Sequence, residues 1–211
     1  MSAGGRFIVL EGLDGAGTTT QARRLAAALR AAGRAVHVTA EPSGGPAGQL
    51  ARLVLTKRLV GAHGQPGGFD PAARALLFAA DRLDHLSVEV LPKLAAGDDV
   101  ISDRYTLSSL AYQSLTTGDL AWVEALNARA RAPDVTLFLR VSPDVALARR
   151  QADNGGGELF EVPAFQREVA RAYDRCVERL KERGERVIVV DGERPVEEVT
   201  AACSAAVAAL G

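Results

Sequence analysis

Glycine and polar residues gather in one nine-residue stretch whose composition suits anion binding. Residues 12–20 read Gly-Leu-Asp-Gly-Ala-Gly-Thr-Thr-Thr. Glycines let backbone N–H groups close around an anion, and a helix that begins directly after them points its positive end toward it. The stretch therefore predicts a phosphate-binding loop. The alternative is a tight strand-to-helix turn without a ligand.

The loop departs from the phosphate-binding pattern G-x-x-x-x-G-K-[ST] at Thr18, because the pattern has lysine there. Thr19 keeps the hydroxyl that binds Mg²⁺, and the three successive threonines can still donate to phosphate oxygens. We expect ATP to bind along this loop and another cation to supply the missing charge. The predicted ATP-binding residues of the loop are Gly12, Leu13, Asp14, Gly15, Ala16, Gly17, Thr18, Thr19 and Thr20.

A second polar cluster occupies residues 103–113, which read Asp-Arg-Tyr-Thr-Leu-Ser-Ser-Leu-Ala-Tyr-Gln. Asp103 follows an apolar run, so its carboxylate is expected near a metal ion at a strand end. Arg104 suits phosphate because its guanidinium donates two parallel hydrogen bonds. The alternative is an ordinary structural ion pair.

A third cluster pairs an aromatic ring with a cation. Phe78 and Arg82 are four residues apart, so they share one face of a helix. Together they are suited to hold a flat base and its phosphate, although a core phenylalanine beside a surface arginine would give the same spacing. His85 is expected to be a surface or capping histidine.

Five short apolar segments alternate with helical patterns along the chain. The predicted strands cover residues 6–11, 35–39, 99–102, 135–141 and 186–190. The predicted helices cover residues 19–32, 47–60, 71 to 91 or 95, 108–114, 119–131, 143–150, 163–183 and 195–210. This alternation predicts an α/β fold with a five-stranded parallel sheet covered by helices on both faces. Because ligands gather at the carboxyl ends of such strands, the polar clusters should meet there.

The composition limits the kinds of partner. The net charge is -1, which gives no basic field for a nucleic-acid polymer or an anionic membrane. No apolar run approaches the ~20 residues of a membrane span, and the N-terminus lacks a signal-peptide pattern. Cys176 and Cys203 are too few for a disulfide framework. We expect a cytoplasmic protein with one domain over residues 1–211.

The chain resembles the thymidylate kinases, a P-loop nucleoside monophosphate kinase family. The motifs occur in the family's order: Glu-Gly-Leu-Asp-Gly-Ala-Gly, Glu-Pro, Phe-x-Ala-x-Arg, Asp-Arg-Tyr and Ser-Ser-x-Ala-Tyr-Gln. The similarity spans nearly the whole chain, and residues 103–113 are its most specific part. The resemblance implies Mg²⁺-dependent transfer of the ATP γ-phosphoryl group to dTMP, giving dTDP, by a homodimer.

The resemblance also implies roles for single residues. Asp14 would bind the sugar 3′-hydroxyl and help order the metal with Thr19 and Asp103. Phe78 would stack on thymine, and Tyr112 would lie under the deoxyribose. Arg149 would lie beside adenine. The other implied dTMP-binding residues are Glu41, Arg52, Arg82, Arg104, Ser108, Ser109 and Gln113.

The chain lacks both cations that the family uses at the transferred phosphate. Thr18 replaces the loop lysine, and Leu159 stands where a lid arginine is expected, in a lid predicted over residues about 150–163. We hypothesise that Arg150 supplies the charge, which makes Asp14, Arg104 and Arg150 the predicted catalytic residues. The alternatives are a kinase for another nucleoside monophosphate, or a nucleotide-binding protein that has lost catalysis.

Overall fold

Five parallel strands form the centre of the molecule, in the order β2-β3-β1-β4-β5. The structure, a computed structural model, describes residues 4–59, 69–152 and 163–210. The strands are β1 (Phe7–Gly12), β2 (Val36–Ala40), β3 (Asp99–Asp103), β4 (Val135–Arg140) and β5 (Val187–Asp191). All neighbouring pairs are parallel, which confirms the predicted sheet.

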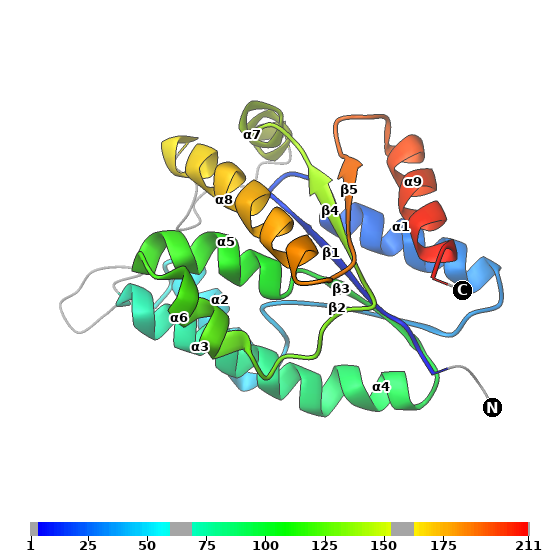
Figure 1. Cartoon of the computed structure of the whole chain (residues 1–211), viewed down its shortest axis with the longest axis horizontal. Coiled ribbons are helices and arrows are strands. Elements are labelled where there is room, and N and C mark those ends of the chain that lie inside the picture. The colour runs from blue at the N-terminus through cyan, green and yellow to red at the C-terminus, as the bar shows by residue number, and fades with distance from the viewer. Residues whose placement is uncertain (1–3, 60–68, 153–162, 211) are drawn as a thin grey trace.

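Helices cover both faces of this sheet (Figure 1). Helices α1 and α9 lie on one face, and α3, α4, α5, α6 and α8 lie on the other. The helices are α1 (Thr18–Ala31), α2 (Pro46–Leu55), α3 (Pro71–His85), α4 (Leu91–Ala95), α5 (Thr106–Thr117), α6 (Leu120–Asn127), α7 (Pro143–Ala152), α8 (Pro163–Glu182) and α9 (Val196–Ala208). Within the described residues, no helix has the length and apolar character to cross a membrane.

The central strands are mostly apolar because both of their faces are covered. All six residues of β1 are buried. Phe7 and Val9 pack with Leu86, Val90 and Leu94 from the helices below the sheet. Ile8 and Leu10 belong to the larger core, which includes the buried side of α1. The outer strands β2 and β5 are less buried, as their positions at the sheet edges require.

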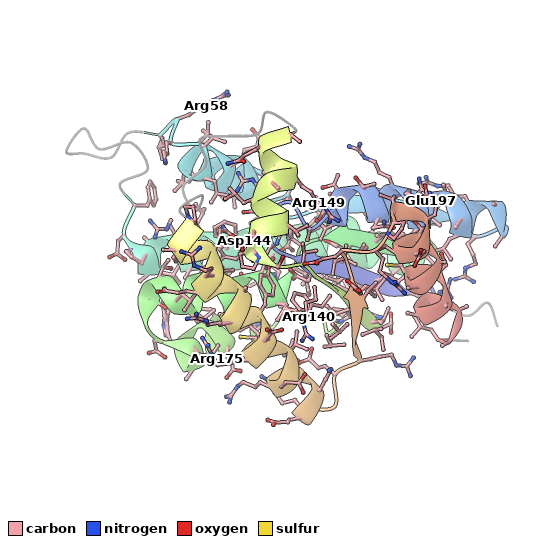
Figure 2. The ribbon with its side chains drawn as sticks, turned by 90° about the horizontal axis from the view of Figure 1, so that it is seen from above. Arg58, Arg140, Asp144, Arg149, Arg175 and Glu197 are labelled. Atoms are coloured by element: carbon pink, nitrogen blue, oxygen red, sulfur yellow. The ribbon has the colours of Figure 1, made fainter. Side chains whose placement is uncertain are left out.

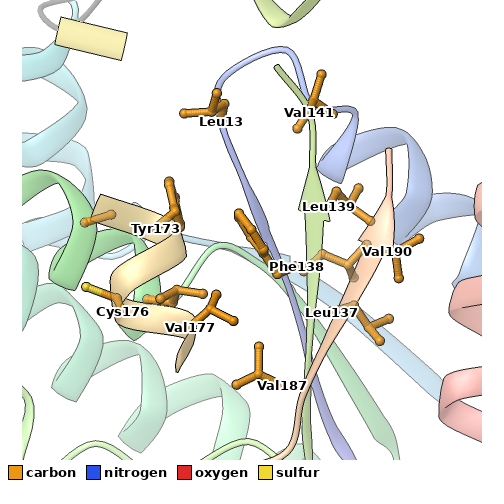
Figure 3. Packing of buried hydrophobic residues seen from close by; sticks show 14 of the residues in the cluster. Leu13, Leu137, Phe138, Leu139, Val141, Tyr173, Cys176, Val177, Val187 and Val190 are labelled. Atoms are coloured by element: carbon orange, nitrogen blue, oxygen red, sulfur yellow. The ribbon is translucent and has the colours of Figure 1, made fainter. Parts of the chain in front are cut away.

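Helix α8 closes the core over β4. Figure 3 shows Tyr173 and Val177 on the side of α8 that faces the sheet, while Cys176 points away from β4. The rings of Tyr173 and Phe138 stack with their centroids 5.2 Å apart and their planes 21° apart. This packing holds Tyr173 rigidly below the residues that follow β1 and β3.

Several predicted helices differ from the observed ones at their ends; the helix predicted over residues 119–131, for example, ends at Asn127. The helix predicted over residues 47–60 ends at Leu55, because Thr56 caps it and Lys57 has a φ of 56°. The long run predicted from residue 71 contains a π-helical turn, η1 (Leu86–Val90), between α3 and α4. Most of the predicted lid, including Leu159, lies outside the described residues.

Candidate active site

A cavity of about 910 Å³ opens at the carboxyl ends of the strands. Segments that follow each of the five strands contribute to its wall, which confirms that the polar clusters meet at this edge. The predicted site residues in its lining are Asp14, Gly15, Ala16, Gly17, Thr18, Thr19, Thr20, Glu41, Arg52, Phe78, Arg82, Asp103, Arg104, Ser108, Ser109, Tyr112, Gln113, Arg149 and Arg150.

The loop between β1 and α1 has the geometry of an anion-binding turn. Gly15 has a φ of 92°, and a Cβ there would lie 2.3 Å from the carbonyl oxygen of Ala146. Gly17 caps α1 with a φ of 91°, and no side chain caps the first turn. The first N–H groups of α1 therefore remain available to a ligand at the positive end of the helix.

Gly12 and Leu13 are not part of the cavity wall. Leu13 is buried in the core, and the carbonyl oxygen of Gly12 accepts a hydrogen bond from Arg104. Any contact of these two residues with a nucleotide would therefore have to come from their backbone N–H groups.

Thr19 and Asp103 provide oxygen atoms suited to a hard cation. The Thr19 hydroxyl donates to Asp103 Oδ2, while the buried Oδ1 atom has no hydrogen-bond partner among the described residues. The described residues contain no cluster of three or more His, Cys, Asp or Glu side chains that could hold a metal. Mg²⁺ fits this arrangement, because it typically keeps several waters and takes phosphate oxygens beside one or two carboxylates.

Arg104 lies at the centre of the cavity wall. Its Nη2 atom donates to Asp14 Oδ1 at 2.6 Å, and its Nη1 atom donates to the Tyr173 hydroxyl at 2.9 Å. Its φ of 77° is unusual for a residue other than glycine, and such backbone strain concentrates at functional sites. Arg104 does form an ion pair, with Asp14, as the alternative interpretation of this cluster predicted, and the pair lies in the cavity wall.

The carboxylate of Glu11 interacts electrostatically with Arg104. This carboxylate is fully buried and accepts hydrogen bonds from the Tyr105 and Ser108 N–H groups and from the Ser108 hydroxyl. Burial raises the pKa of Glu11, while the charge of Arg104 and the hydrogen bonds from Ser108 and Tyr105 lower it. Glu11 was predicted at the end of a strand and opens the Glu-Gly-Leu-Asp-Gly-Ala-Gly motif, but nothing local to it in the sequence shows which groups it would meet.

Arg82 is buried and nearly all of its hydrogen-bond donors are used by the protein. It is 2% exposed, so the predicted alternative of a surface arginine is wrong. Nη2 donates to Glu41 at 2.7 Å and to the Tyr105 carbonyl oxygen at 2.9 Å. Nη1 donates to Ser109 and Asn127. Only Nε has no partner among the described residues, and this atom is itself buried.

The remaining predicted dTMP-binding residues lie around these charges. The Tyr112 hydroxyl donates to Asp14 Oδ2 at 3.3 Å, so Asp14 is held between a tyrosine and an arginine. Arg52 donates from Nη2 to the Pro42 carbonyl oxygen at 2.6 Å. Phe78 and Gln113 complete this part of the wall. The arrangement has a phenylalanine, a tyrosine and three arginines around one space.

Helix α7 brings two arginines to the side of the cavity near the glycine loop. Figure 2 looks down on the carboxyl edge and shows α7, with Arg149, crossing above the sheet. Arg149 Nη1 donates to the Gly192 carbonyl oxygen at 2.9 Å. Arg150 packs on the loop, with its Cγ atom 2.9 Å from the position of a Cβ on Gly15. Both arginines therefore lie where a bound triphosphate would be close.

The segment after β5 also contributes to the wall, through Gly192, Arg194 and Val196. The sequence analysis did not include these residues. They follow the carboxyl end of a predicted strand. The rule that ligands gather at the carboxyl ends of parallel strands would therefore have found them. With Arg194, the described lining contains six arginines and three carboxylates, a balance that suits anionic ligands.

His85 is buried and its side chain makes no capping hydrogen bond, so the prediction of a surface or capping histidine is wrong. It is 1% exposed and lies at the end of α3, where its ring contacts Glu41 and Thr39. The 3.6-residue spacing placed His85 on a helix correctly, but it did not show that β2 covers that side of the helix.

A parallel α/β sheet with a glycine loop between β1 and α1 and a charged cavity at its carboxyl edge defines the P-loop class of nucleotide-binding proteins. Comparison with known proteins narrows this class. The family model for thymidylate kinase matches residues 10–203. The chain therefore belongs to the thymidylate kinase family, which confirms the resemblance seen in the sequence.

Individual relatives match at nearly full length. The chain is 39% identical over 207 residues to a protein of Dinoroseobacter shibae named thymidylate kinase, covering 95% of each chain. It is also 39% identical over 207 residues to the thymidylate kinase of Ruegeria pomeroyi, covering 95% of this chain and 93% of the relative. Such coverage includes every segment that lines the cavity.

Proposed function

We propose that this chain transfers the γ-phosphoryl group of ATP to dTMP, giving ADP and dTDP, as part of dTTP biosynthesis. The observation that carries the proposal is that one cavity has two sides of different chemical character. The glycine loop forms one side, and Phe78, Arg82 and Arg104 form the other. Phosphoryl transfer needs two anionic phosphates to be aligned, neutralised and shielded from water, and little covalent chemistry from the protein.

On the donor side, the backbone N–H groups of the glycine loop would bind the ATP phosphates. Arg149 would lie beside adenine. Thr19 and Asp103 would hold Mg²⁺, and Asp14 would help to order it. When bound, this ion would supply positive charge that offsets the charge of the phosphates. The support for these roles is the open first turn of α1 and the unpartnered Asp103 Oδ1 atom.

On the acceptor side, Asp14 would accept a hydrogen bond from the sugar 3′-hydroxyl, and Phe78 would stack on thymine. Tyr112 would lie under the deoxyribose, where a 2′-hydroxyl would clash. Arg52 and Arg104 would bind the acceptor phosphate, and Glu41 would hold Arg82 near the base edge. Ser108, Ser109 and Gln113 would line the thymine pocket. The support for this assignment is that all of these residues line the same cavity.

We assign the missing catalytic charge to Arg150. Thr18 cannot carry a charge, and Arg150 contacts the glycine loop from α7 while lining the cavity. Its guanidinium would offset charge that develops on the transferred phosphoryl group, which is the main contribution of a protein to this reaction. Residues about 150–163 would form a lid over ATP within a single domain.

We further infer a cytoplasmic homodimer. Both cysteines are free, which agrees with a reducing compartment. Helices α2 and α3 pack against each other, and each leaves leucines exposed. These are Leu50, Leu53, Leu76 and Leu83. A second copy of the chain would cover them.

The acceptor is tested by ADP release from ATP and Mg²⁺ with dTMP, dUMP, CMP or AMP in parallel. We expect ADP release to be fastest with dTMP, because the 2′-hydroxyl of a ribonucleotide would meet Tyr112. A faster rate with CMP or AMP would contradict the proposal and indicate a different nucleoside monophosphate kinase.

A further inference from the structure

His85 lies directly behind the acceptor side of the cavity without lining it. Its Nδ1 atom is 3.2 Å from Glu41 Oε1, and its Nε2 atom is 2.8 Å from the Thr39 hydroxyl. An ionised carboxylate only accepts hydrogen bonds, so Nδ1 must carry the hydrogen that joins His85 to Glu41. The ring is held at both nitrogens and is 1% exposed, which leaves it one orientation.

The carboxylate of Glu41 connects this ring to the cavity. Oε1 accepts from His85, and Oε2 accepts from Arg82 Nη2 at 2.7 Å. The side chains of Glu41 and Arg82 are only 3% and 2% exposed. In such a dry environment each hydrogen bond is strong, and losing one leaves a buried group that water cannot satisfy.

The spacing on α3 makes this connection possible. Phe78, Arg82 and His85 recur at i, i+4 and i+7, so they share one face of the helix. Phe78 and Arg82 reach the cavity, while His85 lies beneath the end of β2. On its outer side, His85 Nε2 is 3.8 Å from Glu89 in the π-helical turn, and His37 is 2.8 Å from Glu89.

We propose that His85 is a positioning residue for dTMP. It fixes the carboxylate of Glu41, and that carboxylate fixes the plane of the Arg82 guanidinium, so that Arg82 keeps its place in the cavity wall beside which the nucleotide would bind. The proposal rests on the proposed function, since it takes the ligand beside Arg82 to be dTMP.

Two substitutions separate positioning from simple packing. In His85→Asn the side-chain amide can take the place of Nδ1 and still donate to Glu41. In His85→Gln the amide takes the place of Nε2, and the hydrogen bond to Glu41 is lost. We expect His85→Gln to raise the Kd and the KM for dTMP about tenfold, the effect of losing one hydrogen bond to a charged group. We expect His85→Asn to stay near the wild type.

The Kd and KM for ATP and the melting temperature are measured on the same proteins. His37→Asn is the matched control, because His37 bonds Glu89 and does not reach Glu41. Equal effects of the Asn and Gln variants, or equal losses for ATP and dTMP, would show a merely structural histidine and overturn the proposal. An unchanged dTMP affinity in a folded His85→Gln protein would overturn it as well.

Thr39→Val covers the case in which the Gln variant does not fold. It removes only the hydroxyl at Nε2, and we expect the Kd for dTMP to rise about threefold with the ATP affinity unchanged. No change would contradict the proposal. Direct binding of dTMP, measured without turnover, distinguishes the positioning role of His85 from the proposed kinase activity. Binding that weakens as predicted in a protein without kinase activity would overturn the proposed function alone.

Discussion

At the scale of single residues, the glycine loop lacks the lysine of the phosphate-binding pattern, and Leu159 stands where a lid arginine is expected. Thr18 is 6% exposed and carries no charge, yet it lies in the cavity wall beside Thr19 and Gly17. Six arginines line the same cavity, so cations are abundant around the position that lacks lysine. The arginine that contacts the glycine loop is the one expected to take over its role.

Arg150→Ala should lower kcat about 10²- to 10³-fold, because a preorganised charge in a dry site contributes strongly to the transition state. The KM for dTMP should change little, since Arg150 lies on the ATP side. Arg149→Ala should mainly raise the KM for ATP. Arg175→Ala, on the exposed side of α8, is the control and should match the wild type in steady-state kinetics. Near-normal turnover of both the Arg150 and Arg149 variants would contradict the assignment.

The identities of most site residues could be predicted from the sequence, but their partners could not. Asp14, Arg104 and Tyr112 were recognisable from their motifs, whereas the hydrogen bonds that join them connect positions 90 or more residues apart. His85 was predicted at the surface and is buried, because spacing along a helix reports which residues share a face and not what covers it.

At the scale of secondary-structure elements, the residues of the site are positioned by the ends of strands and the starts of helices. The loop after β2 is fixed to α3 by Ser43, whose N–H and hydroxyl donate to Asp81 at 2.8 and 2.6 Å. This contact orients the start of α2, which carries Arg52 into the cavity wall. The geometry of the acceptor side therefore depends on close packing between α2 and α3.

Gly48→Ala tests this packing. A Cβ at Gly48 would lie 2.3 Å from the Ser43 carbonyl oxygen and 2.6 Å from Asp81 Oδ1. We expect a loss of about 1–3 kcal/mol in the free energy of unfolding, although alanine is the better helix former by about 1 kcal/mol. Gly44→Ala is the control, because a Cβ there meets nothing within 4 Å. Urea denaturation of both variants measures the difference; equal stabilities would contradict the packing argument.

The order and type of the elements followed from periodicity, and their ends followed less well. The five strands were predicted within one or two residues, since continuous apolar runs between turns are typical of a covered parallel sheet. The helix that ends at Leu55 was predicted to reach residue 60. A positive φ is usually signalled by glycine, but here the residue with positive φ is Lys57. The π-helical turn at Leu86–Val90 has no sequence signal that the analysis used.

At the scale of the whole molecule, charge pairs at the opposite edge of the sheet stabilise the fold. The Asp99 side chain is buried and accepts hydrogen bonds from Arg6 and Arg34 at 2.6 Å each. Burial alone would raise its pKa, but the hydrogen bonds from Arg34 and Arg6 hold the pKa of Asp99 well below its usual range. A carboxyl with a lowered folded-state pKa stabilises the protein above its unfolded pKa, and this stabilisation is lost on acidification.

Asp99→Asn should therefore lower the free energy of unfolding by about 2 kcal/mol at pH 7, where both arginines lose a charged partner. The difference from the wild type should shrink as the pH falls below about 4, the pKa of an unfolded aspartate. Asp174→Asn breaks only an exposed pair with Arg140 and serves as the control. Urea titrations at pH 7 and pH 3 measure the free energy of unfolding of each protein. A difference between Asp99→Asn and the wild type that grows as the pH falls would contradict the prediction.

The inferred homodimer is tested by light scattering. We expect a mass of twice the 22.1 kDa chain. Leu53→Glu should shift the protein to monomer, because it places a charge in the exposed leucine strip of α2. Ile188→Glu is the matched control, since Ile188 is similarly exposed but lies on β5. A monomeric wild type, or dissociation by both variants, would contradict the inferred interface.

The central claim is that this chain phosphorylates dTMP although Thr18 replaces the loop lysine. The most direct measurement is the steady-state turnover of the wild-type protein with ATP, Mg²⁺ and dTMP, with the Kd for dTMP measured by calorimetry on the same preparation. We predict dTMP-dependent formation of dTDP and ADP with a kcat in the range of about 1–100 s⁻¹ that is typical of kinases. Binding of dTMP without any dTDP or ADP would contradict the claim and identify a nucleotide-binding protein that has lost catalysis.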